Sequence, residues 1–175
     1  MIPFTVLLKH SLIYGSILSL GMTCIIFATF FICPRIWIDS APVDIQQAVG
    51  QMTLRDQWTK RWVRLVTLAG VFALIGHSIA RLIMLGNGRV SFLDVALSVF
   101  LIIQVFNIVD LLFIDWLLIA TFRPSFVVFP GTEHLTGYRD YGFYFRGFVK
   151  GVVGSLIVSV IIASVTSGVM LLLSM

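Results

Sequence analysis

Four long apolar runs, separated by shorter polar segments, dominate the pattern of hydrophobic and polar positions along the chain. They cover residues 11–33, 62–85, 92–121 and 148–175. A helix needs about 20 predominantly apolar residues to cross the hydrocarbon core of a bilayer, and it satisfies all of its backbone hydrogen bonds there. We therefore predict an all-α integral membrane protein: a four-transmembrane-helix bundle forming a single transmembrane domain over residues 1–175.

The segments between the runs carry turn signals. Pro34 ends the first run, and Gly86-Asn87-Gly88 separates the second run from the third. Because a Gly-Asn-Gly sequence is typical of a tight turn, we expect the second and third helices to form a helical hairpin. The two longer loops cover residues 34–61 and 122–147.

Composition supports a membrane location. Of 175 residues, 59% are hydrophobic and only 11% are charged, whereas soluble domains carry about 25% charged residues. A soluble fold of this size cannot bury so much apolar surface, so the excess is expected to face the lipid bilayer. The net charge of +4 comes from basic residues that flank the apolar runs, which is typical of membrane topology. We expect no nucleic-acid partner.

The distribution of Lys and Arg predicts the orientation. Nine lie in or beside the two longer loops: Arg35, Arg55, Lys60, Arg61, Arg64, Arg123, Arg139, Arg146 and Lys150. The other three are Lys9, Arg81 and Arg89. Positively charged loops stay in the cytoplasm. We therefore expect both longer loops to be cytoplasmic and both termini to be outside, in the cytoplasmic (plasma) membrane.

The first longer loop contains a short amphipathic segment. Four residues fall on one face at helical spacing: Ala41, Ile45, Ala48 and Met52. This pattern predicts an interfacial helix that lies on the membrane or against the bundle. Thr53 and Asp56 then resemble a capping box, so we expect the second transmembrane helix to begin before it enters lipid. Trp58 and Trp62 are typical of the membrane interface.

Small residues recur at every fourth position on the first and fourth runs. The first carries Ser11, Gly15, Ser19 and Thr23, and the fourth carries Gly147, Gly151, Ser155, Ser159, Ala163 and Ser167. Such stripes let helix backbones approach closely in lipid. We expect these two helices to pack on each other, antiparallel. A pore lined by Ser and Gly is the alternative, and the same faces are candidate contacts with a second copy of the chain or with another membrane protein.

The third run differs from the others because it holds five polar residues: Asp94, Gln104, Asn107, Asp110 and Asp115. Carboxylates inside a bilayer are costly and normally face the bundle interior or water, so we expect this helix to be central. No Lys or Arg lies at the depth of Asp110 on the other runs. Asp110, with Asn107, Gln104 and Asp115, is our candidate proton- or cation-binding site. A hydrogen-bonded, structural Asp110 is the alternative.

Two further groups of polar residues need partners. Arg81 and Asp94 lie at similar depths on the two arms of the expected hairpin, so we predict a structural ion pair there. His77 lies one turn from Arg81 on the same face and is expected to join it; a proton relay is the alternative. Asp115, near the loop boundary, is expected to pair with an arginine such as Arg123 or Arg146.

The loop after the third run is rich in side chains that bind polar or phosphorylated ligands. The candidates are Glu133, His134, Tyr138, Arg139, Asp140 and Arg146. The alternative is an ordered interfacial loop whose aromatic residues and arginines meet the lipid headgroups. We therefore treat this loop as a second candidate site.

The sequence carries no signature of a cofactor or metal enzyme. It has no Walker loop, no paired CxxC and no HExxH. The three histidines fall at different depths, which argues against a haem with two histidine ligands. Cys24 and Cys33 lie on opposite sides of one helix and cannot bridge each other. We expect no cofactor and no metal site, and the protein is more consistent with a non-enzyme.

Three functions remain open. The first is a proton- or cation-coupled transporter or channel component, oligomeric and using Asp110; it predicts that Asp110 is accessible to water. The second is a non-catalytic subunit or scaffold of a larger complex, which predicts dry polar groups that all have partners. The third is an interface enzyme acting on a lipid or amphipathic substrate through Glu133, His134 and Arg139, which predicts a cavity between the loop and the bundle.

Overall fold

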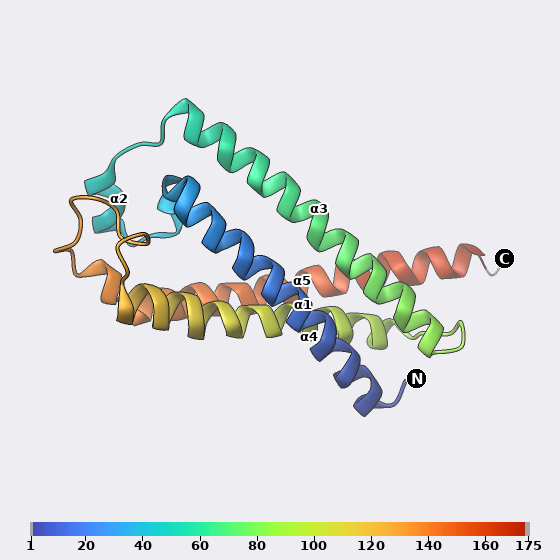
Figure 1. The fold of residues 1–175 in the computed structure, drawn as a ribbon. Helices are drawn as coiled ribbons and strands as arrows, with labels where there is room; N and C mark the ends of the chain where they lie inside the picture. The colour runs from blue at the N-terminus through green and yellow to red at the C-terminus, as the bar shows by residue number, and fades with distance from the viewer. Residues whose placement is uncertain (1, 174–175) are drawn as a thin grey trace.

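The computed structural model describes residues 2–173, and every regular element in that range is a helix (Figure 1). The elements are α1 (Phe4–Ile32), the 3₁₀ helix η1 (Pro34–Ser40), α2 (Val43–Val49), α3 (Leu54–Leu85), α4 (Phe92–Val109), the π-helix η2 (Asp110–Phe122), the 3₁₀ helix η3 (Gly137–Arg139) and α5 (Tyr141–Leu173). Because η2 continues α4 without a break, four long helices result. Each is long and apolar enough to cross a membrane.

The four predicted spans are therefore confirmed as helices, and three of them begin earlier than the apolar runs. α1 starts at Phe4, α3 at Leu54 and α5 at Tyr141, since polar residues at the ends of a run can remain helical outside lipid. The first turn of α3 has the predicted capping box: Thr53 Oγ1 accepts the Asp56 N–H at 3.2 Å, and the Asp56 carboxylate accepts the Thr53 N–H at 3.0 Å. Residues 174–175 of the predicted fourth span lie outside the described residues.

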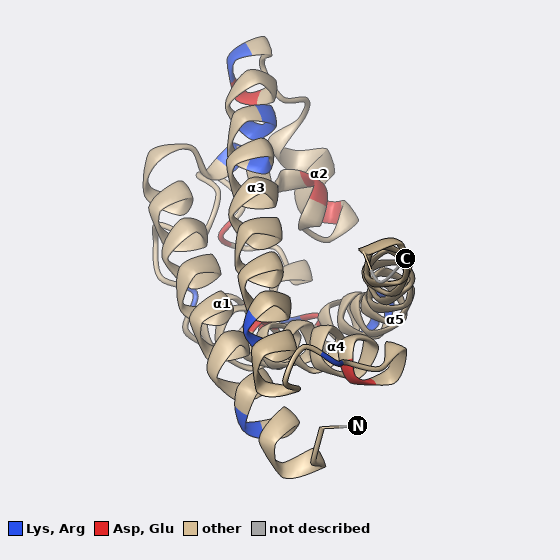
Figure 2. Cartoon of the chain, turned by 90° about the vertical axis from the view of Figure 1, so that its right-hand side faces the viewer, with Lys and Arg blue, Asp and Glu red and all other residues tan. Residues whose placement is uncertain are grey.

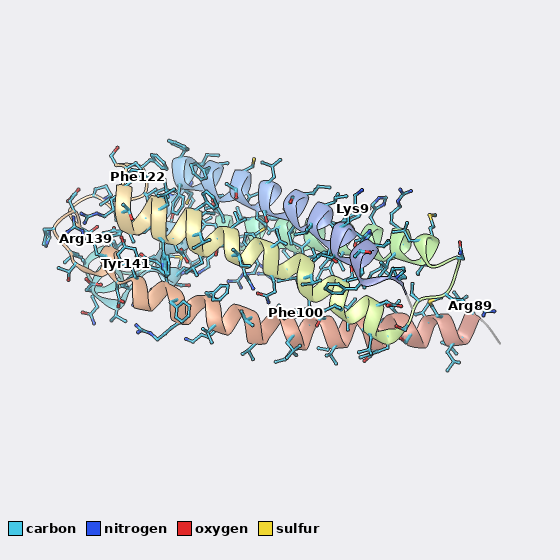
Figure 3. All side chains as sticks on the ribbon, turned by 90° about the horizontal axis from the view of Figure 1, so that it is seen from below. Lys9, Arg89, Phe100, Phe122, Arg139 and Tyr141 are labelled. Atoms are coloured by element: carbon cyan, nitrogen blue, oxygen red, sulfur yellow. The ribbon has the colours of Figure 1, made fainter. Side chains whose placement is uncertain are left out.

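The two longer loops lie at one end of the molecule, here called the loop side (residues 33–53 and 123–140). The described ends of the chain and the α3–α4 turn lie at the other end, here called the terminal side (Figure 1). Figure 3 shows Phe122, Arg139 and Tyr141 at the loop side, and Lys9 and Arg89 at the terminal side. The α3–α4 turn uses two residues with positive φ, Asn87 at 53° and Gly88 at 80°. The predicted tight turn is therefore present, but α3 and α4 diverge from it and make few contacts, so they do not pack as the predicted helical hairpin (Figure 1).

The central helix is α4, as the polar residues on its run predicted. α1 packs on one side of α4 and α5 on the other (Figure 2), and η2 continues both contacts toward the loop side. α3 packs chiefly on α1 and meets α4 only weakly. Within the described residues, α5 contacts neither α1 nor α3. The arrangement is thus more open than the predicted four-helix bundle.

The predicted packing of the first helix against the fourth is wrong, although the small-residue stripes do pack. The α1 stripe meets α4: Ser11 Oγ lies 3.2 Å from Ser98 Oγ, and Gly15 lies against Val105. The α5 stripe meets the other side of α4, with Ser155, Ser159 and Ala163 all buried. The periodicity of small residues identified the packing faces of α1 and α5, but both faces pack on the same central helix, α4.

The loop side is an ordered cap with an apolar core of its own. Ile38, Ile45, Phe129 and Tyr138 are buried together there. The predicted amphipathic helix is present as α2, and Ile45 is fully buried against the second loop. The Asp44 carboxylate of α2 also accepts the Gly137 N–H at 2.9 Å. The helix lies against the loop-side cap, through η1 and η3, and not against the long helices of the predicted bundle.

Candidate functional site

A cavity of about 470 Å³ lies where the loop-side cap meets the long helices. The end of α1, the last turn of α4 with η2, and the start of α5 form its walls, while η1 and residues of the second loop form its roof. α1 and α5 do not contact each other in the described chain, and the cavity lies between them. Three of the predicted ion-site residues line it: Asn107, Asp110 and Asp115.

The π-helix places Asp110 and Asp115 together. In an α-helix, residues five apart diverge by roughly 140°. A π-helix closes its hydrogen bonds between residues five apart, so residue i+5 returns close to the side of residue i. Asp110 is the first residue of η2 and Asp115 follows it by one such step. The sequence prediction assumed α-helical geometry throughout. It placed both carboxylates in one candidate site but expected Asp115 to pair with an arginine. No sequence signal for the π-helix was recognised.

Neither Asp110 nor Asp115 has a protein partner in the part of the chain that the structure describes. Among residues 2–173, no side chain or backbone N–H forms a hydrogen bond or ion pair with Asp110 or Asp115, and the two repel each other electrostatically. The expected pairing of Asp115 with Arg123 or Arg146 is not present. Arg146 instead lies 3.6 Å from Asp140 at the exposed start of α5. Both carboxylates are half-buried, and a carboxylate that loses water without gaining a partner is costly, so the cavity is suited to a ligand that supplies positive charge or protons.

The amides beside the carboxylates differ in their roles. Gln104 donates to Ser155 Oγ at 2.5 Å and so joins α4 to α5 outside the cavity. Asn107 lines the cavity, and its Nδ2 is buried with no hydrogen-bond partner in the described chain. Unpartnered buried donors are rare in folded proteins and commonly bind water or a ligand. We therefore assign Asn107 to the same candidate site as Asp110 and Asp115. Gln104 contributes to the packing of α4 against α5.

Seven aromatic residues contribute to the rest of the cavity wall. The residues concerned are Phe30, Trp37, Phe129, Tyr138, Phe143, Tyr144 and Phe148. The faces of aromatic rings attract cations, most strongly where water is excluded. Arg146 and Lys150 also line the cavity, but both are exposed and so lie toward its mouth. The two carboxylates and the aromatic side chains are thus more buried than the two basic side chains.

The roof of the cavity is fixed by buried hydrogen bonds. The Tyr138 hydroxyl accepts the Phe129 N–H at 3.0 Å and lies 2.8 Å from Thr132 Oγ1. The Trp37 indole N–H donates to Thr29 Oγ1 at 2.9 Å, which attaches η1 to α1. Tyr138, predicted as a ligand-binding residue of the loop, lines the cavity while its hydroxyl holds the loop. The second loop is therefore a structured part of the site.

Four of the other loop candidates lie away from the cavity, whereas Arg146 lines it. Glu133, His134 and Arg139 are exposed and do not line it. Hydrogen bonds from its own N–H and from that of Gly131 lower the pKa of the Glu133 carboxyl, so this side chain stabilises a turn. Asp140 accepts the Phe143 N–H at 2.8 Å and caps α5. The structure does not gather these residues into one ligand site.

The predicted ion pair between Arg81 and Asp94 is not present in the described structure. Asp94 instead forms a capping box at the start of α4: its carboxylate accepts the Ser91 N–H at 2.9 Å, and Ser91 Oγ accepts the Asp94 N–H at 3.1 Å. Its charge is therefore stabilised at the start of its own helix, where it also interacts with the backbone of Ile2. His77 does not join Arg81; its ring lies 5.9 Å from that of Tyr14 on α1. The Ser91–Asp94 spacing was a readable capping signal that the sequence interpretation missed.

No group of three or more His, Cys, Asp or Glu side chains within residues 2–173 is arranged to hold a metal ion. Comparison with protein-family models, with curated proteins and with solved structures finds no match to this chain. The site must therefore be interpreted from its own chemistry: two carboxylates and one amide without partners, in a cavity with aromatic walls.

Proposed function

We propose that this chain is an integral protein of the cytoplasmic membrane that binds an organic cation around Asp110 and Asp115, as part of proton- or cation-coupled transport. The observation that carries the proposal is the pair of carboxylates, without protein partners, that faces one cavity with aromatic walls. A protonated amine or quaternary ammonium group combines the positive charge that the carboxylates attract with the apolar surface that aromatic rings bind.

The orientation follows from the positions of the basic residues. Nine of the twelve Lys and Arg side chains belong to the loops and helix ends of the loop side, and several cluster at the loop-side end of α3 (Figure 2). The positive-inside rule then makes the loop side cytoplasmic. In this orientation the cavity lies near the cytoplasmic boundary of the membrane, and its ligand enters from the cytoplasm or from the inner leaflet.

The coupling to protons follows from the same carboxylates. Two neighbouring carboxylates repel each other, so binding one proton or one cation relieves the repulsion. An organic cation and a proton therefore compete for the same pair. Alternate occupancy of one site by two ions is the minimum requirement for exchange transport.

The two other functions are less well supported. A scaffold requires polar groups that all have partners, whereas Asn107, Asp110 and Asp115 lack them in the described chain. An interface enzyme requires a cavity between the loop and the bundle, and one is present. Its expected catalytic residues Glu133, His134 and Arg139, however, do not line that cavity.

The test uses tetraphenylphosphonium, a permanently charged lipophilic cation, and tetraphenylborate, an anion of the same shape. Binding of each to the purified full-length protein in nanodiscs is measured by equilibrium dialysis. We expect saturable binding of the cation and none of the anion. Asp110→Asn and Asp115→Asn should each weaken cation binding at least about tenfold, which corresponds to only 1.4 kcal/mol.

Asp39→Asn is the matched control, because Asp39 is an exposed loop-side carboxylate that does not line this cavity. It should leave cation affinity unchanged. Acidification should weaken binding to the wild-type protein, and cation binding in a weak buffer should release protons. Equal affinity for the cation and the anion, or equal loss in all three variants, would contradict the proposal.

A further inference from the structure

A second, more open cavity of about 980 Å³ lies between α2 and the loop-side end of α3. It is separate from the cavity of Asp110 and Asp115 and shares no lining residue with it. Its polar lining includes Asp39, Gln46, Gln47, Lys60, Arg61 and Arg64. Figure 2 shows the basic residues gathered at this end of α3, with acidic residues on the neighbouring α2 segment.

The charges of this cavity are not balanced. Lys60 pairs with Asp39. Arg61 and Arg64 form no ion pair or hydrogen bond within residues 2–173, and both are exposed to the cavity. The glutamine side chain of Gln46 is already used, because its Nε2 donates to the Ala41 carbonyl at 2.7 Å. Two guanidinium groups therefore face an open cavity whose lining carboxylate, Asp39, is already paired with Lys60.

Two tryptophans indicate the level of this cavity relative to the membrane. Trp58 and Trp62 lie on the same helical segment as the arginines, and their side chains are 60% and 61% exposed. They project from a neighbouring face of α3, since residues 58 and 62 are one helical turn apart while residues 61 and 64 fall on the side toward α2. Exposed tryptophans at the end of a membrane-spanning helix lie at the level of lipid headgroups. Arg61 and Arg64 therefore lie at the level where lipid phosphates are found.

We propose that this cavity binds the phosphate group of an anionic phospholipid from the leaflet on the loop side. Arginine binds phosphate through two parallel N–H donors in a fixed planar geometry, and two neighbouring guanidinium groups match the charge of an anionic headgroup. Basic pockets at the cytoplasmic ends of membrane helices are well suited to such lipids. The phospholipid bound here would tie α2 to α3, two elements that make no direct contact in the described chain, because the Lys60–Asp39 ion pair joins α3 to η1.

The experiment is native mass spectrometry of the full-length protein in a maltoside detergent, titrated with dioleoylphosphatidylglycerol or dioleoylphosphatidylcholine. We expect one phosphatidylglycerol to be retained in preference to phosphatidylcholine. The double variant Arg61→Gln/Arg64→Gln should bind phosphatidylglycerol roughly 30-fold more weakly, with no change for phosphatidylcholine. Arg61→Lys/Arg64→Lys keeps the charge but loses the planar donors, so its loss should be smaller.

The matched control is Arg35→Gln/Arg55→Gln. It removes the same charge from the loop side, but these arginines line a different cavity. It should keep most of the affinity for phosphatidylglycerol, and thermal unfolding verifies that all variants are folded. Equal losses in the two glutamine double variants, or no preference for phosphatidylglycerol in the wild-type protein, would overturn the proposal.

A competition experiment with inorganic phosphate distinguishes a lipid phosphate from a soluble phosphate compound as the ligand of this cavity. If the site is built for a lipid, millimolar phosphate should not displace bound phosphatidylglycerol. Displacement by phosphate, with binding of phosphate itself abolished by Arg61→Gln/Arg64→Gln, would assign the site to a soluble phosphate compound and refute the lipid. Binding of tetraphenylphosphonium at the other cavity should be unaffected by these variants, so the two proposals fail independently.

Discussion

Gly15 on α1 lies directly against Val105 on α4. A Cβ atom added to Gly15 would lie 2.6 Å from the Val105 Cβ and 3.1 Å from the carbonyl oxygen of Ile102. Carbon atoms prefer separations of about 3.5–4.0 Å, so the two helices approach to a distance that only glycine permits here. The contact between α1 and the central helix depends on the absence of a side chain at this position.

Gly15→Ala should therefore destabilise the protein by about 1–3 kcal/mol, the usual cost of overpacking. The measurement is reversible unfolding in mixed micelles, monitored by circular dichroism. Gly21→Ala is the control on the same helix, because an added Cβ there would contact nothing within 4 Å. That variant should be neutral or gain up to about 1 kcal/mol from the higher helix propensity of alanine. If both substitutions had the same effect, the close α1–α4 contact would be ruled out.

A pair of cysteines can distinguish the observed packing from the packing that the sequence suggested. Ser11→Cys with Ser98→Cys, in a background lacking Cys24 and Cys33, should form a disulfide on oxidation. The two Oγ atoms lie 3.2 Å apart, which matches the short reach of a disulfide. Ser11→Cys with Ser159→Cys should not cross-link, since α1 and α5 make no contact in the described chain. The readout is a mobility shift on a non-reducing gel.

The sequence predicted which segments form helices better than it predicted which helices pack together. The apolar runs identified all four long helices because a bilayer demands about 20 apolar residues per span. The stripes through Gly15 and Ser155 identified the packing faces because small residues are needed wherever helices approach closely. Neither signal specifies a partner. A stripe on α1 fits a stripe on α5 as well as it fits Val105 and Ser98, and only the three-dimensional arrangement selects α4.

The candidate site was predictable in part for a related reason. Asp110 and Asn107 were identified because polar residues in a long apolar run are costly unless they serve a purpose. Asp115 was placed in the same candidate site, but its position beside Asp110 was not predicted, because it arises from the change to a π-helix at Asp110. The cavity itself depends on Tyr138 and other residues of a distant loop, whose position relative to the helices has no periodic signal.

Tyr138→Phe should loosen the roof of the cavity. The substitution removes the acceptor for the Phe129 N–H and the partner of Thr132, and an unsatisfied buried polar group costs about 1–3 kcal/mol. Limited digestion with trypsin measures the effect, since Arg139 follows this residue and is exposed. Cleavage there should be faster in the variant. Tyr141→Phe is the control: its hydroxyl bond to Thr121 is exposed, and cleavage should proceed at the wild-type rate.

Cys33 should react with iodoacetamide more slowly than an unhindered thiol. Burial raises the pKa of the Cys33 thiol, and the hydrogen bond to the Asp56 carboxylate, 3.5 Å away, raises it further. A raised pKa means less of the reactive thiolate at a given pH, so the alkylation rate should increase only at higher pH. Asp56→Asn removes the negative charge and should accelerate alkylation at pH 8. Asp39→Asn, a loop-side carboxylate that does not contact Cys33, should not.

Gly147→Leu should block the cavity of Asp110 and Asp115 without removing any of its charges. Gly147 lines that cavity, and a Cβ atom added to it would meet nothing within 4 Å, so the leucine side chain has open space to occupy. Binding of tetraphenylphosphonium should then fall at least about tenfold, although both carboxylates remain. Stability should not decrease, because leucine is the better helix former by about 1 kcal/mol.

Gly154→Leu is the matched control on the same helix. A Cβ atom there also has free space, but Gly154 does not line the cavity, so the variant gains the same side chain without obstructing the ligand. It should bind tetraphenylphosphonium as the wild-type protein does. Wild-type binding by Gly147→Leu would mean that the cation is attracted to the surface of the protein by its carboxylates and does not enter the cavity. Loss of binding in Gly147→Leu alone would establish that the cavity holds the cation.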